Sequence, residues 1–266
     1  MARPVELVMP KHRIFIEPFA GGASLYFMKY NLAEVNVLND FDQFVYNAYV
    51  VVQSWPELKI KVFKEPWHLL RGSERAKRIA FRCIKNEAQH YKIDSYPDIR
   101  GFFLFYVRMR FGFNCNAWSP SDRLLKGKDI DVDVLFSHFD ACYEKMKEEN
   151  VQLYCDDWAD VMMKYNEEDA FAFVDPPYLQ AVRKGYYGIN EVMPSDIAAV
   201  LRNFKGKWMV TYGNSSVVVE SFADVTTKMM VHKAPYESRV APLEIVLANY
   251  DFGELKGLKV VEYKGG

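Results

Sequence analysis

The chain has 266 residues and a formal net charge of -1, and half of its residues are hydrophobic. A chain of this composition can bury a full core, which excludes disordered, collagenous and low-complexity proteins. It contains no apolar run of the roughly 18–20 residues that cross a bilayer, and its first ten residues do not resemble a signal peptide. Its four cysteines show no CxxC spacing, which argues against a zinc site or a disulfide framework. We therefore expect a cytoplasmic globular protein without metal or membrane contact, built as one large domain or as a domain with an inserted lobe.

Segments typical of strands and helices alternate toward both ends of the chain. An apolar run at Arg13–Glu17 ends in a Pro-Phe-Ala-Gly-Gly turn, a helical pattern follows, and Val35–Asn39 leads into a helix that ends near residue 53. Further strands are expected at 151–155, 170–174, 207–212, 225–232 and 243–250, with a helix at 194–203. This alternation predicts an α/β fold with a mostly parallel sheet and an antiparallel edge.

The middle of the chain differs in charge from the rest. Residues 57–128 hold 16 basic and 7 acidic side chains, a net charge of +9, whereas residues 129–175 hold 3 and 14, a net charge of -11. The basic block is mostly helical by pattern, with a loop or hairpin at 110–119, and it is rich in aromatic residues. It predicts either a face that binds a polyanion and stacks bases, or a helical lobe with a solvated basic face and an aromatic core. We expect residues 56–150 to form an inserted domain, and 1–55 with 151–266 to form the main one.

Acidic residues end four of the predicted strands. They are Glu17, Asp40, Asp157 and Asp175. The carboxyl ends of parallel strands meet at one edge of a sheet, and ligands of open α/β sheets bind there. These four residues therefore predict where the functional site lies.

The segment EPFAGGAS at 17–24 stands between a predicted strand and a predicted helix. Glycines there let a ligand approach the backbone, and the start of the helix presents free N–H groups. Asp40 comes 23 residues after Glu17 in the sequence, a spacing typical of the acidic residue that binds a ribose hydroxyl in a nucleotide-binding fold. A tight turn with a helix cap explains the same residues equally well.

The segment Asp175-Pro176-Pro177-Tyr178 directly follows a buried apolar strand. Two prolines stiffen the turn and remove N–H groups, which leaves carbonyl oxygens as acceptors. A carboxylate, a carbonyl and an aromatic ring in one rigid turn suit a planar group with an exocyclic amine. Such an amine donates to both acceptors while its ring stacks on Tyr178.

Together, EPFAGGAS, the strand-end Asp40 and DPPY resemble the Dam-like class of DNA adenine-N(6) methyltransferases, which use S-adenosyl-L-methionine. FFLFYVRMRFGFNCNAWS resembles the recognition segment of that class, and APLEIVLANYDF resembles one of its late strands. The likeness spans about residues 14–252 and implies a Rossmann-like class I methyltransferase sheet with an inserted, mainly helical target-recognition domain. The chain departs from the class in two places. It lacks a clear Lys-Trp-x-Gly-Gly-Lys segment before the first strand, and FNCN stands where FNG is common, so a GATC target is not implied.

The resemblance assigns a role to each matching residue. Phe19 to Ser24 would wrap the methionine part of the cofactor, Asp40 would bind its ribose, and Asp157 with Trp158 would contact its adenine. Asp175 and the carbonyl of Pro176 would accept hydrogen bonds from the target amine. The expected catalytic residues are Asp175, Pro176, Pro177 and Tyr178, and the expected cofactor-binding residues are Glu17, Pro18, Phe19, Ala20, Gly21, Gly22, Ser24, Asp40, Asp157 and Trp158.

The insert supplies the expected contacts with duplex DNA. Arginine pairs with guanine edges and asparagine with adenine edges, so some residues there are candidate base readers, although each could equally contact a phosphate. These candidates are Arg108, Arg110, Asn114 and Asn116, and the expected phosphate contacts are Arg71, Arg75, Lys77, Arg78 and Arg82. A monomer is expected. A cognate restriction endonuclease is one expected partner, because a restriction-modification enzyme, an orphan regulator and a phage protection factor look alike in sequence.

Three alternatives remain open at this point. An RNA methyltransferase acting on adenine or on the guanine 2-amino group would also carry a DPP-aromatic turn, although the long basic insert favours DNA. Protein glutamine methylation is disfavoured because Asp175 stands where that family carries asparagine. A catalytically weak DNA-binding relative is the third alternative, and the missing segment before the first strand is the argument for it.

Overall fold

A computed structural model describes residues 5–30, 33–112, 120–126, 131–177, 192–233, 243–254 and 260–261. The chain divides into two compact units, which are treated separately below. Unit 1 comprises Met1–Phe41 with Glu149–Gly266, and unit 2 comprises Asp42–Glu148. The sequence placed the first boundary at residue 55, but the helix that follows Asp42 packs on helices of unit 2 and therefore belongs with it.

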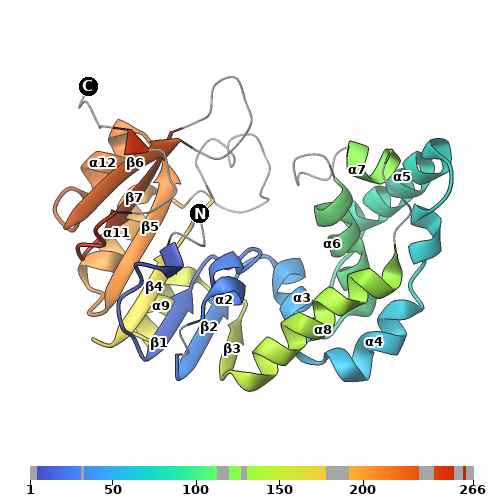
Figure 1. Cartoon of the computed structure of the whole chain (residues 1–266), viewed down its shortest axis with the longest axis horizontal. Coiled ribbons are helices and arrows are strands. Elements are labelled where there is room, and N and C mark those ends of the chain that lie inside the picture. The colour runs from blue at the N-terminus through green and yellow to red at the C-terminus, as the bar shows by residue number, and fades with distance from the viewer. Residues whose placement is uncertain are drawn as a thin grey trace. The chain divides into compact units, whose positions relative to one another are not determined.

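Unit 1 is built on one mixed sheet with strand order β3-β2-β1-β4-β5-β7-β6-β8 (Figure 1). The first five strands of that order run parallel, and β7, β6 and β8 pair antiparallel. The strands are β1 (Ile14–Glu17), β2 (Val35–Asn39), β3 (Val151–Tyr154), β4 (Ala170–Val174), β5 (Lys207–Gly213), β6 (Lys228–Lys233), β7 (Leu243–Ala248) and β8 (Val260–Val261). The predicted α/β fold, with its parallel sheet and antiparallel edge, is thereby confirmed.

Three helices of unit 1 bury one face of this sheet: α9 (Trp158–Lys164), α11 (Pro194–Arg202) and α12 (Ser216–Phe222). Helix α2 (Ser24–Met28) contacts the other face, where the Tyr26 N–H donates to Glu17. Met162 of α9, Ile197 of α11 and Phe222 of α12 share one apolar core with Ile16 and Val210 of the strands. Strand β4 is buried along its whole length, as expected for a central parallel strand. The short helix α12 was not expected from the sequence.

The other face of the sheet carries aromatic side chains near the amino ends of the strands and polar side chains toward their carboxyl ends. Phe15 of β1 and Phe171 of β4 lie 6.2 Å apart between ring centroids, and His12 lies against both. Side chains alternate between the two faces of a strand, so Glu17 shares this face with Phe15. On β5, Thr211 shares it too, because the register of β4 and β5 aligns Phe171 with Lys207. This face therefore leads to the expected site.

Unit 2 is helical in the part that the structure describes. Its elements are α3 (Gln43–Gln53), α4 (Trp55–Phe63), the 3-10 helix η1 (Trp67–Leu70), α5 (Glu74–His90), α6 (Ile99–Phe111), α7 (Asp122–Leu125) and α8 (Val132–Glu148). Within the basic block, the sequence predicts its best helices at 75–91 and 99–110, and α5 and α6 match them within one residue at each end, whereas α8, in the acidic stretch, was not foreseen. The expected loop or hairpin at 110–119 lies mostly outside the described residues.

Aromatic side chains form the core of unit 2. Trp55 packs edge-on against Phe136 and Phe139, and Trp67 packs edge-on against Phe103. All five of these rings are buried. Of the aromatic residues in the basic block, Trp67 and Phe103 therefore belong to the core and not to a face that stacks bases, whereas Tyr96 is exposed and Phe113 and Trp118 lie outside the described residues. Among the described residues, no helix is long and apolar enough to span a membrane.

Candidate active site

The four acidic strand ends lie on four adjacent strands of unit 1. Strands β3, β2, β1 and β4 are neighbours in that order, and their register aligns Glu17 with Leu38 and Asn39 with Tyr154. Their carboxyl ends therefore face the same edge of the sheet. The structure brings the glycine turn after β1, Asp40, Asp157 and Asp175 to that edge, as the sequence predicted.

The glycine turn is held in an open, left-handed conformation. Gly21 and Ala23 have φ angles of 50° and 44°, a region that costs an ordinary residue about 1–2 kcal/mol. A Cβ atom on Gly21 would meet no atom within 4 Å, so glycine is needed there for its backbone angles and not for lack of space. The Gly21 N–H donates to Oδ2 of Asp40 at 2.8 Å. The outer side of the turn is thus open to a ligand, while Asp40 fixes its inner side.

Asn39 anchors this edge of the sheet, and the sequence analysis did not single it out. Its side-chain amide donates to the carbonyl of Pro18 at 2.9 Å, and its side-chain oxygen accepts from the Asp156 N–H at 3.0 Å. Its backbone carbonyl also accepts from the Ala20 N–H at 2.8 Å. One buried residue therefore ties together the turns that follow β1, β2 and β3. The available signal was its place directly before Asp40.

Glu17 supports the glycine turn from the interior. Its side chain is only 3% exposed, and Oε1 accepts the N–H of Tyr26 in α2 at 3.0 Å. Burial raises the pKa of Glu17 to about 8, with the negative charge of Asp175 adding to the effect and the Tyr26 N–H opposing it. The carboxyl is therefore mostly protonated at neutral pH. Its hydrogen bond to the Tyr26 N–H joins the end of β1 to α2 and so stabilises the glycine turn between them.

Asp175 leaves β4 on the face that carries Glu17. Its residue surface is exposed, and the Thr211 hydroxyl donates to its Oδ1 at 2.6 Å. The surrounding protein still desolvates the carboxyl enough to raise its pKa to about 6, helped by the charge of Glu244 and opposed by the Thr211 hydrogen bond. Pro176 is buried and Pro177 half-buried. Tyr178, the expected stacking residue, lies outside the described residues.

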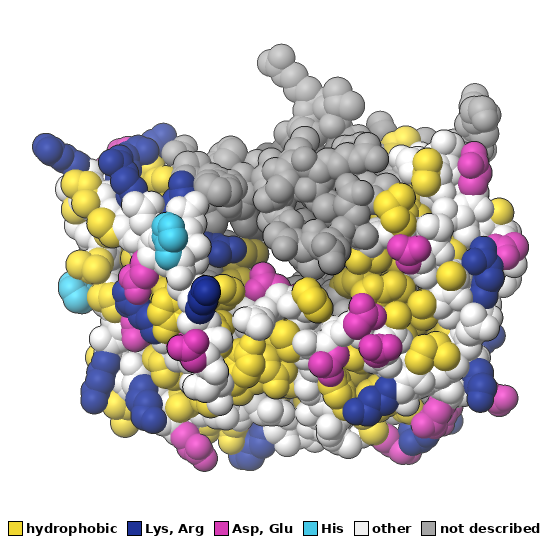
Figure 2. All heavy atoms as spheres, turned by 180° about the vertical axis from the view of Figure 1, so that it is seen from behind, with side chains coloured by type: hydrophobic (Ala, Val, Ile, Leu, Met, Phe, Trp, Pro, Cys, Tyr) yellow, Lys and Arg dark blue, Asp and Glu magenta, His cyan; other side chains and the backbone are white. Residues whose placement is uncertain are grey.

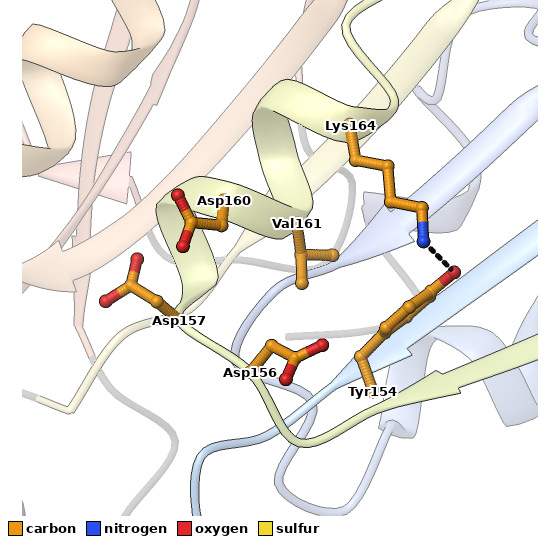
Figure 3. A pocket seen from close by; sticks show the side chains of 6 residues that line it. All are labelled: Tyr154, Asp156, Asp157, Asp160, Val161 and Lys164. Carbon is orange, nitrogen blue, oxygen red and sulfur yellow. Dashed lines mark hydrogen bonds between the residues drawn. The ribbon is translucent and has the colours of Figure 1, made fainter.

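A pocket of about 220 Å³ opens at the end of β3 (Figure 3). Asp157 stands at its edge and caps α9 by accepting the Ala159 N–H at 2.8 Å. Trp158 follows it, with its ring 5.4 Å from that of Phe19 in the glycine turn. At the other end of the pocket, Lys164 donates to the hydroxyl of Tyr154 at 2.9 Å. The residues that line the pocket are Tyr154, Asp156, Asp157, Asp160, Val161 and Lys164.

Several of the expected DNA contacts lie on the surface of unit 2. Arg71, which follows η1, and Arg75 and Arg82 of α5 are exposed. Arg78 is exposed as well and pairs with Glu74 at 2.8 Å. Figure 2 shows Lys and Arg side chains gathered on this unit, at the upper left of that view.

Lys77 does not fit the predicted phosphate contact. Its residue is only 3% exposed, because position 77 lies on the face of α5 that packs inward with Ala80, Phe81 and Ile84. Arg108 is half-buried and Arg110 exposed, both in the last turn of α6. Asn114 and Asn116 lie outside the described residues.

Comparison with known proteins gives this arrangement a family. The chain matches the D12 class N6 adenine-specific DNA methyltransferases over residues 3–239. The chain belongs to this family. It is thus an adenine-specific DNA methyltransferase with the α/β methyltransferase fold that the sequence predicted. The family also favours DNA over the RNA and protein alternatives.

One relative matches almost from end to end. It is the Type II methyltransferase M1.LlaDCHI of Lactococcus lactis subsp. cremoris, which is 24% identical over 273 residues. The match covers 92% of this chain and 90% of the relative.

Among the described residues, no group of three or more His, Cys, Asp or Glu side chains is arranged to hold a metal ion.

Proposed function

We propose that this methyltransferase uses S-adenosyl-L-methionine to methylate the 6-amino group of an adenine flipped out of duplex DNA. The observation that carries the proposal is Asp175-Pro176, which extends from β4 beside the glycine turn of β1. A base inside a duplex cannot reach a protein site, so the enzyme must extrude it at a cost of a few kcal/mol.

The residues present fit the expected cofactor. The outer side of the glycine turn is open, and exposed carboxylates of Asp156 and Asp157 border the pocket at the end of β3. Carboxylates accept hydrogen bonds from amino and hydroxyl groups, which an adenosine moiety supplies. We assign the methionine part to residues 19–24, the ribose to Asp40, and the adenine to Asp157 with Trp158. When bound, S-adenosyl-L-methionine supplies a methyl group on an electrophilic sulfonium.

Asp175 and Pro176 act on the target amine. The lone pair of that nitrogen is delocalised into the adenine ring, which makes it a poor nucleophile. By accepting both N–H bonds, the Asp175 carboxylate and the Pro176 carbonyl draw the nitrogen toward tetrahedral geometry and aim its lone pair. Asp175 performs this role when ionised, so the rate should fall as pH drops below about 6. Tyr178 stacks on the flipped base.

Unit 2 serves as the DNA-binding insert in this proposal. Its exposed arginines bind phosphates, and Arg110, with Asn114 and Asn116 beyond it, reads base edges. We assign the phosphate contacts to Arg71, Arg75, Arg78 and Arg82. Since a relative is a Type II methyltransferase, we place the enzyme in restriction-modification. DNA methylated by it should then resist an endonuclease that cuts the same sequence.

The first test is transfer of tritiated methyl from S-adenosyl-L-methionine to unmethylated duplex DNA, with structured RNA as a parallel substrate. Label should appear in N6-methyladenine of DNA. Asp175→Ala should abolish transfer while leaving cofactor binding, measured by calorimetry, largely intact. Asp224→Ala is the matched control, because Asp224 pairs with Arg202 on the surface and should not affect turnover.

Three outcomes would contradict the proposal. Survival of turnover in Asp175→Ala would remove Asp175 from the mechanism. Label in RNA alone would make the enzyme an RNA methyltransferase. Absence of transfer together with absence of cofactor binding would leave a DNA-binding relative.

A further inference from the structure

Polar side chains form a row across the face of the sheet that carries Asp175. Thr211 of β5 lies beside Asp175, and its hydroxyl donates to Oδ1 at 2.6 Å. Glu244 of β7 is paired with Gly213, two residues beyond Thr211 on the same face, and with His232 of β6. His232 Nε2 lies 3.5 Å from the Glu244 carboxylate. The sequence analysis assigned no role to Thr211, Glu244 or His232.

We propose that Thr211 is a positioning residue for methyl transfer: by holding Oδ1 of Asp175, its hydroxyl presents Oδ2 to the amine of the flipped adenine. This inference rests on the proposed role of Asp175 as the amine acceptor. Thr211 suits the task because it is only 2% exposed and sits within β5, between β4 and β7. Its branched Cβ restricts the side chain to few rotamers, so the direction of the hydroxyl is firmly set.

The hydrogen bond has two physical consequences. It restrains rotation of the carboxylate, and misplacing a reacting group by about 1 Å can cost on the order of 100-fold in rate. It also favours the ionised form of Asp175, because a donor stabilises the charged carboxylate. The charged or titratable groups described on this face include Glu17 of β1, Glu244 of β7 and His232 of β6, together with His12 and Lys29, which lie against the Phe15 ring. Of these, Glu244 acts against Thr211, because its negative charge raises the pKa of Asp175.

The test compares Thr211→Val with Thr211→Ser. Valine keeps the shape and strand preference of threonine but removes the hydroxyl, whereas serine keeps the hydroxyl. Single-turnover methylation should fall about 10- to 100-fold in Thr211→Val and stay within about threefold of wild type in Thr211→Ser. DNA affinity and the fluorescence of 2-aminopurine at the target position, which reports base flipping, should remain near wild type in both variants, because the base is flipped before the methyl group is transferred.

A pH profile separates positioning from a merely structural role. The acidic limb of the rate should shift to higher pH in Thr211→Val, since the donor that favours ionised Asp175 is lost. It should shift to lower pH in Glu244→Gln, since the opposing charge is lost. An unchanged rate and pH profile in Thr211→Val would overturn the inference. It would also be overturned if Thr211→Ser, which keeps the hydroxyl, were as slow as Thr211→Val and a thermal melt showed that Thr211→Val is unfolded.

If Asp175→Ala is itself active, the proposed function fails first. If Asp175→Ala is inactive and Thr211→Val behaves as wild type, only this inference fails.

Discussion

Two carboxyl groups at the strand ends of unit 1 and one carboxyl group on the helices of unit 2 have pKa values shifted in opposite directions. In unit 1, Glu17 and Asp175 have pKa values raised to about 8 and about 6, with desolvation as the main cause. In unit 2, Lys59 and the Trp55 N–H bind Asp140 and lower its pKa. Raised pKa values are typical of functional sites, whereas neutralised pairs are typical of a scaffold. The direction of the shift therefore separates the strand-end carboxyls from paired surface carboxyls, and Asp224 and Asp251 of unit 1, whose pKa values are also lowered, belong with the second kind.

Arginine shows the same contrast within unit 2. Arg100 of α6 binds Glu65 at 2.6 Å and Glu87 at 2.5 Å, which joins α6 to α5 and to the end of α4. Arg75 and Arg82, by comparison, lie exposed on α5. A basic block counted from the sequence thus contains both structural cations and surface cations. Only the second kind is available to DNA phosphates.

The largest expected effect tests whether the aromatic residues of unit 2 form its core. Trp67 is buried, donates to the Val62 carbonyl at 2.8 Å and packs on Phe103. Trp67→Ala should lower the free energy of unfolding of this unit by about 3–5 kcal/mol, as measured by urea denaturation. Leu69→Ala, two residues away and 44% exposed in the wild type, should cost well under half of that. Loss of DNA affinity in Trp67→Ala at unchanged stability would instead identify a base-stacking residue.

The next prediction concerns the raised pKa of Glu17. Because the folded state holds this proton more tightly than the unfolded chain, wild-type stability should decline as pH rises from about 4.5 to 8. The decline is about 1.4 kcal/mol for each pH unit between the two pKa values. Glu17→Gln keeps an oxygen for the Tyr26 N–H without a titrating proton, so its stability should change less over this range. Urea denaturation at pH 5, 6, 7 and 8 measures the difference. Parallel curves for the two proteins would show that Glu17 does not titrate in this interval.

The sequence predicted the parts of the site that depend on local order. Strand-end acids and the Pro-Pro turn can be read locally, because a strand, its turn and the next helix are contiguous in the chain. The resemblance to a known methyltransferase class then supplied their roles. Contacts between strands could not be read in this way. Thr211 meets Asp175 across 36 residues, only because β4 and β5 are neighbours in the sheet.

Helical phase explains the remaining differences. Lys77 and Arg78 are adjacent in the sequence, but α5 turns the first inward and the second outward. Charge counting alone cannot separate such neighbours, and so Lys77 was wrongly grouped with the exposed arginines. Helix α8 was missed for a related reason. Its buried residues Leu135, Phe136 and Phe139 are interspersed with acidic residues of the exposed face, and the acidic charge of the segment was counted without regard to its helical period.

The smallest expected effect tests the exposed cations. The logarithm of DNA affinity falls linearly with the logarithm of salt concentration, and each phosphate contact makes this slope steeper by about 0.9. Arg75→Ala should therefore make the slope shallower by about 1. The affinity loss should be only a few-fold at moderate salt and similar for all DNA sequences, because a phosphate contact does not read bases. Arg202→Ala is the control, since that guanidinium pairs with Asp224 on unit 1 and should leave the slope unchanged. Binding titrations at several salt concentrations give both slopes. Equal slopes for Arg75→Ala and wild type would mean that the basic face of α5 serves solubility and that the phosphate contacts lie elsewhere.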